Sequence, residues 1–314
     1  MAKQTRRALQ ITLMIGLFFV SFTFFMFITF PYEVLKEAVA AQLTKETGYT
    51  FRIGNMGPAL PLGFSGENIH IETQNGSSAL DLKGLKFHIE LLSLFTGNLG
   101  VSAQALAGKG NLSFAVNFGL IDLAKGAVIP KRLAIESKNF PLDGIIGFAI
   151  NVATSSPDAN PMVAPLLSAV GVSGELNGTA DFKLDAKNPV QSNGQADLKF
   201  ANAILKLSSP PLELPDQVFR KALIKAKIEN GSVVIDRTSG FVADELELLA
   251  DGKILLKPDA GDSQLDLKVI FRLNAGLKDK FGFLIDAVTG SATSEGRLTM
   301  QVRGSLDAPA VTTF

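Results

Sequence analysis

The stretch that decides the fold is LSFAVNF, residues 112–118. Its apolar residues occupy every second position, and small or polar residues fill the positions between them. Because successive side chains of an extended strand point to opposite faces, this alternation predicts a strand with one apolar face and one wet face. The stretch LDLKVIF, residues 265–271, has the same pattern. Both stretches therefore predict strands of a one-sided β-sheet.

These two strands supply the candidate functional residues. On the apolar side, the candidate hydrophobic groove consists of Leu112, Phe114, Val116, Phe118, Leu267, Val269 and Phe271. On the wet side we expect Ser113, Asn117, Asp266 and Lys268. A packed core and an open groove would both use such an apolar face, so the alternation leaves these two interpretations open.

The alternation recurs along the chain from Tyr49 onward. Its apolar positions are Ile69 and Ile71; Leu80 and Leu82, then Leu85, Phe87, Ile89 and Leu91; Ala180, Phe182 and Leu184; Ala196, Leu198 and Phe200; Leu246, Leu248 and Ala250; and Leu298, Met300 and Val302. Many such strands with Gly and Asn between them predict a curved antiparallel sheet with one apolar face. Helical patterns are too few to cover both faces. The apolar face must therefore close as a barrel, pack as a sandwich, or curve around an apolar ligand.

Helical spacing of apolar residues occurs in three short segments, near residues 33–47, 141–153 and 276–289, and Gly48 is placed to end the first. We therefore divide the chain into a cytoplasmic tip and anchor (1–30), a connector helix (31–48), and the two halves of a β-rich domain (49–156 and 157–314). Pro157, Pro161 and Pro165 mark the junction between these halves.

An uncharged run of 23 residues, 8–30, follows Lys3, Arg6 and Arg7. It is long enough to cross a bilayer as a helix, and the preceding cations favour a cytoplasmic N-terminus. The alternative is a cleaved signal peptide, whose apolar region is shorter and ends at a small-x-small site. Here the nearest Ala-x-Ala, residues 38–40, follows three charged residues. The sequence thus predicts a single uncleaved transmembrane helix, with residues 31–314 beyond the membrane.

The composition limits the partners and the chemistry. Without the three cations before the apolar run, 27 basic residues face 30 acidic ones, which argues against a basic nucleic-acid surface. The chain has no Cys, so disulfides, thiolate metal sites and Cys nucleophiles are excluded. A domain of this length can bury a large core without disulfides. Neither nucleic acid nor a cofactor is an expected partner.

No catalytic or metal-binding motif stands out. His70 and His88 each lie between apolar residues of an alternating stretch, so both are expected on the wet face without convergent partners. GFSGE at 63–67 and GVSGE at 171–175 depart from the Ser elbow pattern G-x-S-x-G, and we interpret both as turns. Gly108-Lys109-Gly110 is interpreted as a hairpin turn. We therefore expect no enzyme.

Four Asn residues match the glycosylation pattern Asn-x-Ser/Thr. They are Asn75, Asn111, Asn177 and Asn230. Three of them are followed by Gly, and Asn-Gly is common in two-residue hairpins. We interpret the four as turns, because glycosylation is relevant only to a eukaryotic secretory protein.

Three stretches resemble the type II secretion system protein N (GspN) family. They are FPYEVLKEAVAAQLTKETGYTFRIGNMGPALPLGFSGENIHI (30–71), GVSGELNGTADFKLDAKNPVQSNGQADLKFANAIL (171–205) and GRLTMQVRGSLDAPAV (296–311). The last is also similar to the ending of AsmA-like envelope proteins. The resemblance implies an inner-membrane protein whose curved, AsmA-like sheet forms a groove in the periplasm. It supplies no catalytic residues.

Three functions follow as expectations. The first is a non-catalytic component of a type II secretion system, anchored in the bacterial inner membrane by one span and exposed to the periplasm. Its partners would be the membrane and other secretion-system components. The alternative is an AsmA-like lipid-binding or lipid-transfer protein that holds acyl chains. The third, an anchored hydrolase, is the least favoured, because no catalytic motif stands out.

Overall fold

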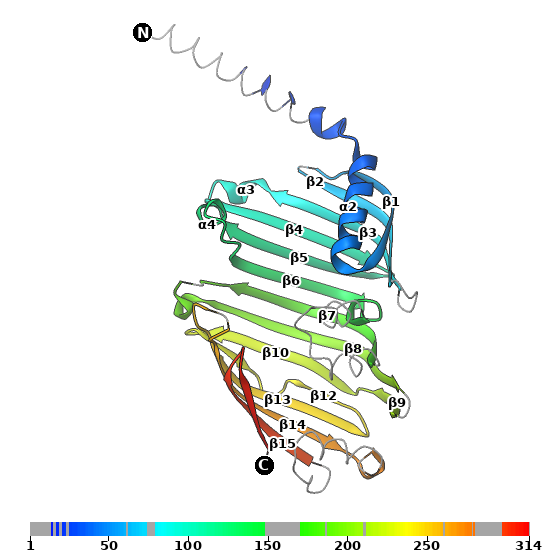
Figure 1. The fold of residues 1–314 in the computed structure, drawn as a ribbon, viewed down its shortest axis with the longest axis vertical. Helices are drawn as coiled ribbons and strands as arrows, with labels where there is room; N and C mark the ends of the chain where they lie inside the picture. Colours follow the sequence, from blue (N-terminus) through cyan, green and yellow to red (C-terminus); the bar gives the residue numbers. More distant parts are fainter. Residues whose placement is uncertain are drawn as a thin grey trace.

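The computed structural model shows one large antiparallel sheet with few helices (Figure 1). It describes residues 14, 17–18, 21–22, 25–60, 62–73, 79–147, 170–185, 187–209, 212–259, 261–277, 279 and 297–313. The sheet has 16 strands, and β1 to β8 lie side by side in chain order. β1 and β16 are the first and last strands of the pairing order and do not pair with each other, so the described strands form an open sheet and not a closed barrel.

The strands range from 3 to 17 residues. They are β1 (Tyr49–Pro58), β2 (Gly63–Thr73), β3 (Ala79–Glu90), β4 (Asn98–Ala107), β5 (Gly110–Gly119), β6 (Pro130–Pro141), β7 (Val170–Lys183), β8 (Asn193–Ser209), β9 (Leu212–Val218), β10 (Lys221–Glu229), β11 (Ser232–Ile235), β12 (Gly240–Val242), β13 (Leu246–Leu255), β14 (Gln264–Leu273), β15 (Arg297–Ser305) and β16 (Pro309–Thr313). The halves 49–156 and 157–314 share this sheet, because β6 pairs directly with β7.

Among the helices that lie wholly within the described residues, α2 is the longest and spans Tyr32–Thr47. The others that lie wholly within the described residues are α3 (Leu91–Leu94), α4 (Leu120–Ala124) and the 3-10 turn η1 (Pro189–Gln191). Gly48 ends α2 in the left-handed conformation, with φ 73°, and its N–H donates to the Thr44 carbonyl. The predicted helix near 33–47 and its stop are therefore confirmed.

The helix α2 lies along the outer edge of β1. The Phe51 backbone N–H donates to the Thr44 hydroxyl at 3.3 Å, and the Lys36 ammonium donates to the Gly54 carbonyl at 3.2 Å. An uncovered edge strand offers unpaired backbone groups to other strands. The helix thus occupies this edge and leaves growth of the sheet to the opposite edge, at β16.

Three Asn residues change which positions of a strand face the apolar side. Asn68 in β2, Asn139 in β6 and Asn202 in β8 have φ values of 52°, 49° and 50°. In β6 and β8 the pairing register shifts at these residues, as in a β-bulge. Beyond the extra residue, the side chains on the apolar face come from even-numbered instead of odd-numbered residues, or the reverse. In β6, for example, Ile135 precedes the bulge and Phe140 follows it. Asn tolerates this left-handed conformation better than other residues with a side chain.

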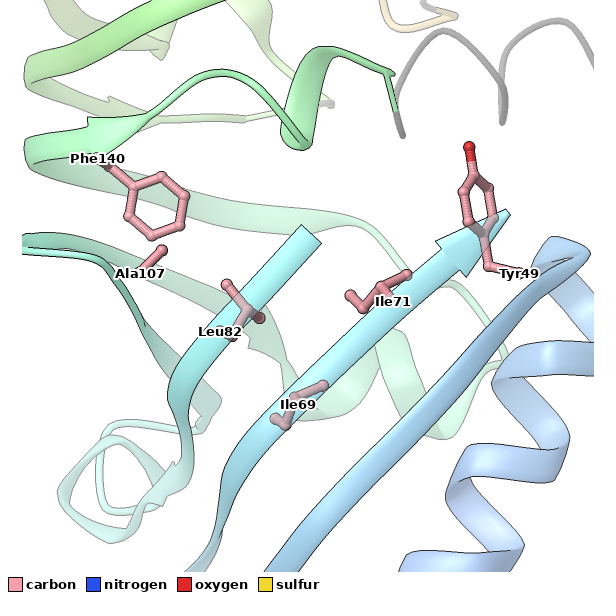
Figure 2. Close-up of a cluster of buried hydrophobic side chains, with 6 residues drawn as sticks. All are labelled: Tyr49, Ile69, Ile71, Leu82, Ala107 and Phe140. Atoms are coloured by element: carbon pink, nitrogen blue, oxygen red, sulfur yellow. The ribbon is translucent and has the colours of Figure 1, made fainter. Parts of the chain in front are cut away.

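Two small clusters of buried side chains lie on the apolar face. The first contains Tyr49, Ile69, Ile71, Leu82, Ala107 and Phe140 (Figure 2). Figure 2 shows the Phe140 ring above Ala107, at the tip of the β4–β5 hairpin. The second contains Ala243, Leu246, Leu273 and Leu277. Both clusters lie where helical or loop segments cover the strand ends.

Several sequence interpretations need correction. GFSGE and GVSGE lie inside β2 and β7 rather than in turns, and so does Asn177-Gly178. Asn111 likewise lies in a strand, β5, and Leu91 begins α3 instead of extending β3. Strand neighbours on both sides supply the pairing that outweighs local turn preference. Gly108-Lys109 and Asn230-Gly231 are hairpin turns, as predicted.

Other predictions fall partly outside the described residues. Residues 145–147 and 275–277 are helical, whereas 148–153 and 280–289 are not described. Asn75, which was predicted to lie in a turn, is also outside the described residues. Of the apolar run 8–30, residues 8–13, 15–16, 19–20 and 23–24 are not described, and no helix within the described part is both long and apolar enough to cross a bilayer.

Candidate functional site

The seven residues of the predicted groove lie on one face of the sheet. Leu112, Phe114, Val116 and Phe118 alternate along β5, and Leu267, Val269 and Phe271 alternate along β14. Directly paired residues point to the same face, and pairing from β5 to β14 keeps both sets on the same side. The strands β6, β7, β8, β10, β11 and β13 separate the two sets. They are parts of one apolar face and do not form a single compact site.

The apolar face is continuous across the sheet. One row of directly paired residues crosses it from β3 to β11: Phe87, Ala103, Phe114, Ile135, Ala180, Ala196, Ala226 and Ile235. Among the described strands from β3 to β15, no paired position on this face holds a charged residue. Such an extended apolar surface is unusual for a monomer unless it is covered or binds something.

A row of small side chains runs along the sheet within this face. Ala180, Ala196 and Ala226 are paired in succession on β7, β8 and β10. Four of the six residues beside this alanine row are larger, namely Leu198 and Ile224 on one side and Phe182 and Ile228 on the other. The remaining two are Gly178 and Gly194, one on each side. A methyl group reaches less far from the sheet than a leucine or phenylalanine side chain. The row is therefore lower than the four larger residues beside it.

Exposure divides the apolar face into two regions. At the closed end, which is the cluster around Phe140, this side chain is only 1% exposed. Along the open stretch, which is the row from Phe87 to Ile235, Phe114 is 41% exposed. Ile224, which flanks the alanine row, is also exposed. Within the same stretch Ala180 (4%) and Ala196 (9%) are buried among larger neighbours. The open stretch is therefore exposed at Phe114 and covered at the two alanines.

The opposite face is polar and carries ion pairs between neighbouring strands. They are Arg52–Glu72 (3.3 Å), Arg132–Asp181 (2.7 Å), Lys225–Asp197 (3.0 Å) and Arg303–Asp266 (3.3 Å), and a hydrogen bond of 2.5 Å joins His70 and Asp81. Hydrogen bonds from Gln301 and Arg303 hold the pKa of Asp266 below its ordinary value. Asp266 and Lys268 are exposed on this face, as expected. Such pairs fix strand register more than they stabilise the fold.

A hollow of about 460 Å³ lies on the polar face over β3 to β7. Ser113, His88 and Glu136 contribute to its lining, together with Arg132 and Asp181. The Arg132 guanidinium donates two hydrogen bonds to the Asp181 carboxylate, at 3.0 and 2.7 Å, which lowers the pKa of Asp181. The arginine is thus already engaged, so the hollow has little capacity for an anion.

Neither histidine forms a catalytic or metal-binding constellation with described residues. The His70 Nδ1 atom lies 2.5 Å from Asp81 Oδ1, and both side chains are more than half exposed. His88 lines the polar hollow. Within the ranges that the structure describes, no three His, Asp or Glu side chains are grouped so as to hold a metal ion.

Sequence reasoning missed part of the open stretch. Ala103 and Ala226 belong to it, yet alanines carry little signal in a hydropathy pattern. Phe64 and Phe87, whose stacked rings are 4.9 Å apart, were not selected as site residues either. The break in alternation from Leu82 to Leu85 indicated that the apolar side chains of β3 change from even to odd positions, opposite Asn68 of β2. The pairing partners, however, cannot be read from one strand alone.

Comparison with models of known protein families, with curated proteins and with solved structures finds no match for this chain.

Proposed function

We propose that the chain is a non-catalytic, membrane-anchored binding protein of the bacterial cell envelope, whose open stretch holds the acyl chains of lipids. The observation that carries this proposal is the uncharged apolar face itself, on which Phe114 is exposed and the alanine row lies two strands away from it. An acyl chain is long, narrow and uncharged, so it suits a low, uncharged row better than a compact polar ligand would. Its burial would remove apolar surface from water at roughly 25 cal/mol per Å².

The first test compares neighbouring residues on opposite faces. In the full-length protein, Phe114→Asp places a carboxylate beside the bound chain, whereas Ser113→Asp places it on the polar face. Because Phe114 is partly exposed, we expect the first variant to fold and to lose about tenfold in affinity for a fluorescent phospholipid, which corresponds to about 1.4 kcal/mol. The second variant should bind normally.

A second variant tests the alanine row itself. Ala226→Phe fills the row from a half-buried position without adding charge. We expect a folded protein with reduced lipid uptake, and co-purified lipid can be measured by extraction and mass spectrometry. The proposal fails if both Phe114→Asp and Ala226→Phe fold and take up lipid normally, or if Phe114→Asp unfolds while Ser113→Asp does not, since the face would then be a packed core.

The anchor is also part of the proposal. Residues 8–30 would span the inner membrane once and leave residues 31–314 in the periplasm. Lys3, Arg6 and Arg7 before the apolar run support this orientation. A periplasm-dependent reporter fused after Phe314 should be active. Activity of a cytoplasm-dependent reporter at that site, or a mature N-terminus near Gln42, would contradict the topology.

A component of a type II secretion system is the second candidate. One observation favours a protein partner. β16 is the terminal strand of the sheet order, and residues 309–312 are exposed. Such an edge can pair with a strand of another protein. Loss of secretion on deleting residues 309–313, with normal lipid uptake, would favour this role over lipid binding.

A further inference from the structure

The hairpins at one end of the sheet carry exposed apolar side chains. Because the strands are antiparallel and follow one another, the connections β1–β2, β3–β4, β5–β6 and β7–β8 all lie at the same end. Each presents at least one large apolar residue to solvent, and those that are more than 60% exposed are Leu60, Leu92, Phe95, Ile121, Val128 and Val190. We call these six residues the apolar tips. Of these, α3 contains Leu92 and is followed by Phe95, and α4 contains Ile121. Figure 1 shows α3 and α4 side by side at this end.

The exposure is high for residues of this type. Phe95 is 88% exposed, Leu92 is 80% exposed, and Ile121 and Val128 are both 70% exposed. Turns normally use Gly, Asn, Asp, Ser or Pro, which satisfy turn geometry and face water. The β4–β5 hairpin at the other end follows this rule with Gly108-Lys109. Turn chemistry therefore does not explain the tips.

Lysine side chains surround the base of α4. Lys187 Nζ lies 3.3 Å from Asp122 Oδ1, and Lys131 Nζ lies 3.7 Å from Asp122 Oδ2. Lys125 adds a third positive charge, and these cations hold the pKa of Asp122 below its ordinary value, chiefly through the Lys187 hydrogen bond. Asp185 is a second carboxylate in this region. Three cations against two carboxylates leave a positive excess around α4, whereas the charged residue next to α3 is Glu90.

Apolar side chains next to lysines are the pattern of a surface that lies at a membrane interface. The apolar groups enter the boundary between headgroups and acyl chains, and the lysines meet anionic headgroups. In the view of Figure 1, the described residues between 17 and 30 run from α2 toward the side on which α3 and α4 lie. An anchor in that direction would bring the tips to the bilayer.

We propose that the apolar tips dock on the surface of the bilayer that holds the anchor, with Phe95 and Ile121 entering its interfacial region. This inference rests on the proposed anchor and is independent of whether the open stretch binds lipid. The sheet then stands end-on to the membrane.

The absence of Cys allows single labelling sites to be introduced in the full-length protein. An environment-sensitive fluorophore is attached at Phe95→Cys, Ile121→Cys, Lys109→Cys or Phe22→Cys. The protein is reconstituted in liposomes of phosphatidylcholine, with and without phosphatidylglycerol. The quencher is a lipid that carries a nitroxide near the top of its acyl chain.

The matched control is Lys109, at the opposite end of the same strand pair as Phe95. β4 has 10 residues, so the two ends lie about 30 Å apart. We expect the nitroxide to reduce emission about twofold at positions 95 and 121, because interfacial side chains lie roughly 5–10 Å deep. Position 109 should be unaffected, and phosphatidylglycerol should strengthen the quenching at 95 and 121.

The outcomes separate docking from anchoring. Quenching at 22 without quenching at 95 and 121 overturns the docking and leaves the anchor intact. Quenching at 95 and 121 without quenching at 22 supports the docking and overturns the anchor. Equal quenching at 109 and 95 also overturns the proposal, because the whole sheet would then lie flat on the membrane.

Discussion

The closed end and the open stretch of the apolar face are built from the same kinds of residue and differ in what lies over them. Phe140 and Phe114 lie on the same face, on neighbouring strands. Phe140 covers the β4–β5 hairpin and packs with Ala107 and Leu82, whereas Phe114 remains 41% exposed. The difference shows that alternation creates an apolar face, while the covering segments decide whether that face becomes a core.

The largest expected effect separates the two phenylalanines directly. Phe140→Ala should lower the free energy of unfolding by about 3–5 kcal/mol, because it removes a fully buried ring and leaves a cavity. Phe114→Ala should cost roughly 1–2 kcal/mol, because the ring is partly in water already. Urea denaturation of the two variants measures the difference. Equal losses would mean that the open stretch is as well packed as the closed end.

The close approach of the β4–β5 hairpin to β6 gives the next test. A Cβ atom on Gly110 would lie 2.1 Å from the Asn139 carbonyl oxygen and 2.5 Å from the Phe140 Cα atom. Gly110→Ala should therefore cost about 1–3 kcal/mol, as overpacking does. Gly57→Ala is the control, since nothing lies within 4 Å of its added Cβ. A harmless Gly110→Ala, measured by thermal melting, would show that the closed end is not tightly packed.

The bulge at Asn139 separates Ile135, in the open stretch, from Phe140, at the closed end. Its φ of 49° is unfavourable for residues with a Cβ, so Asn139→Ala should cost about 1–2 kcal/mol. Asn139→Gly should be nearly neutral, because Gly adopts this conformation freely. The melting temperatures of the two variants provide the comparison. If the alanine variant is as stable as the glycine variant, the bulge is not held in this conformation.

The smallest effect concerns the polar side of the open stretch. Arg132 holds the pKa of Asp181 below its ordinary value, so the pair stabilises the fold above that ordinary pKa and loses its effect as pH falls through the lowered one. Since both side chains are nearly half exposed, Asp181→Asn should cost only about 0.5 kcal/mol at neutral pH. The difference from the parent protein, measured by urea denaturation, should vanish at acidic pH. A difference that grows on acidification would contradict this assignment.

The sequence was sufficient for the one-sided sheet because side-chain direction in a strand depends only on local period. LSFAVNF and LDLKVIF were therefore assigned to strands with the correct faces. Asn177-Gly178 was misassigned, because pairing with β6 and β8 is a long-range property that the dipeptide does not report. The alanine row was also beyond reach, since it depends on the register of three strands.

The order of the strands bears on how the chain reaches this structure. From β1 to β8, each strand pairs with the next one in the chain, and the connecting loops are mostly short. Closing such loops costs little entropy, and contacts that are local in sequence favour rapid folding. With α2 along the β1 edge, the sheet can extend only toward its C-terminal edge. We therefore expect each new strand to pair with the strand before it while the chain is still being synthesised. The sheet would then assemble in the order of synthesis.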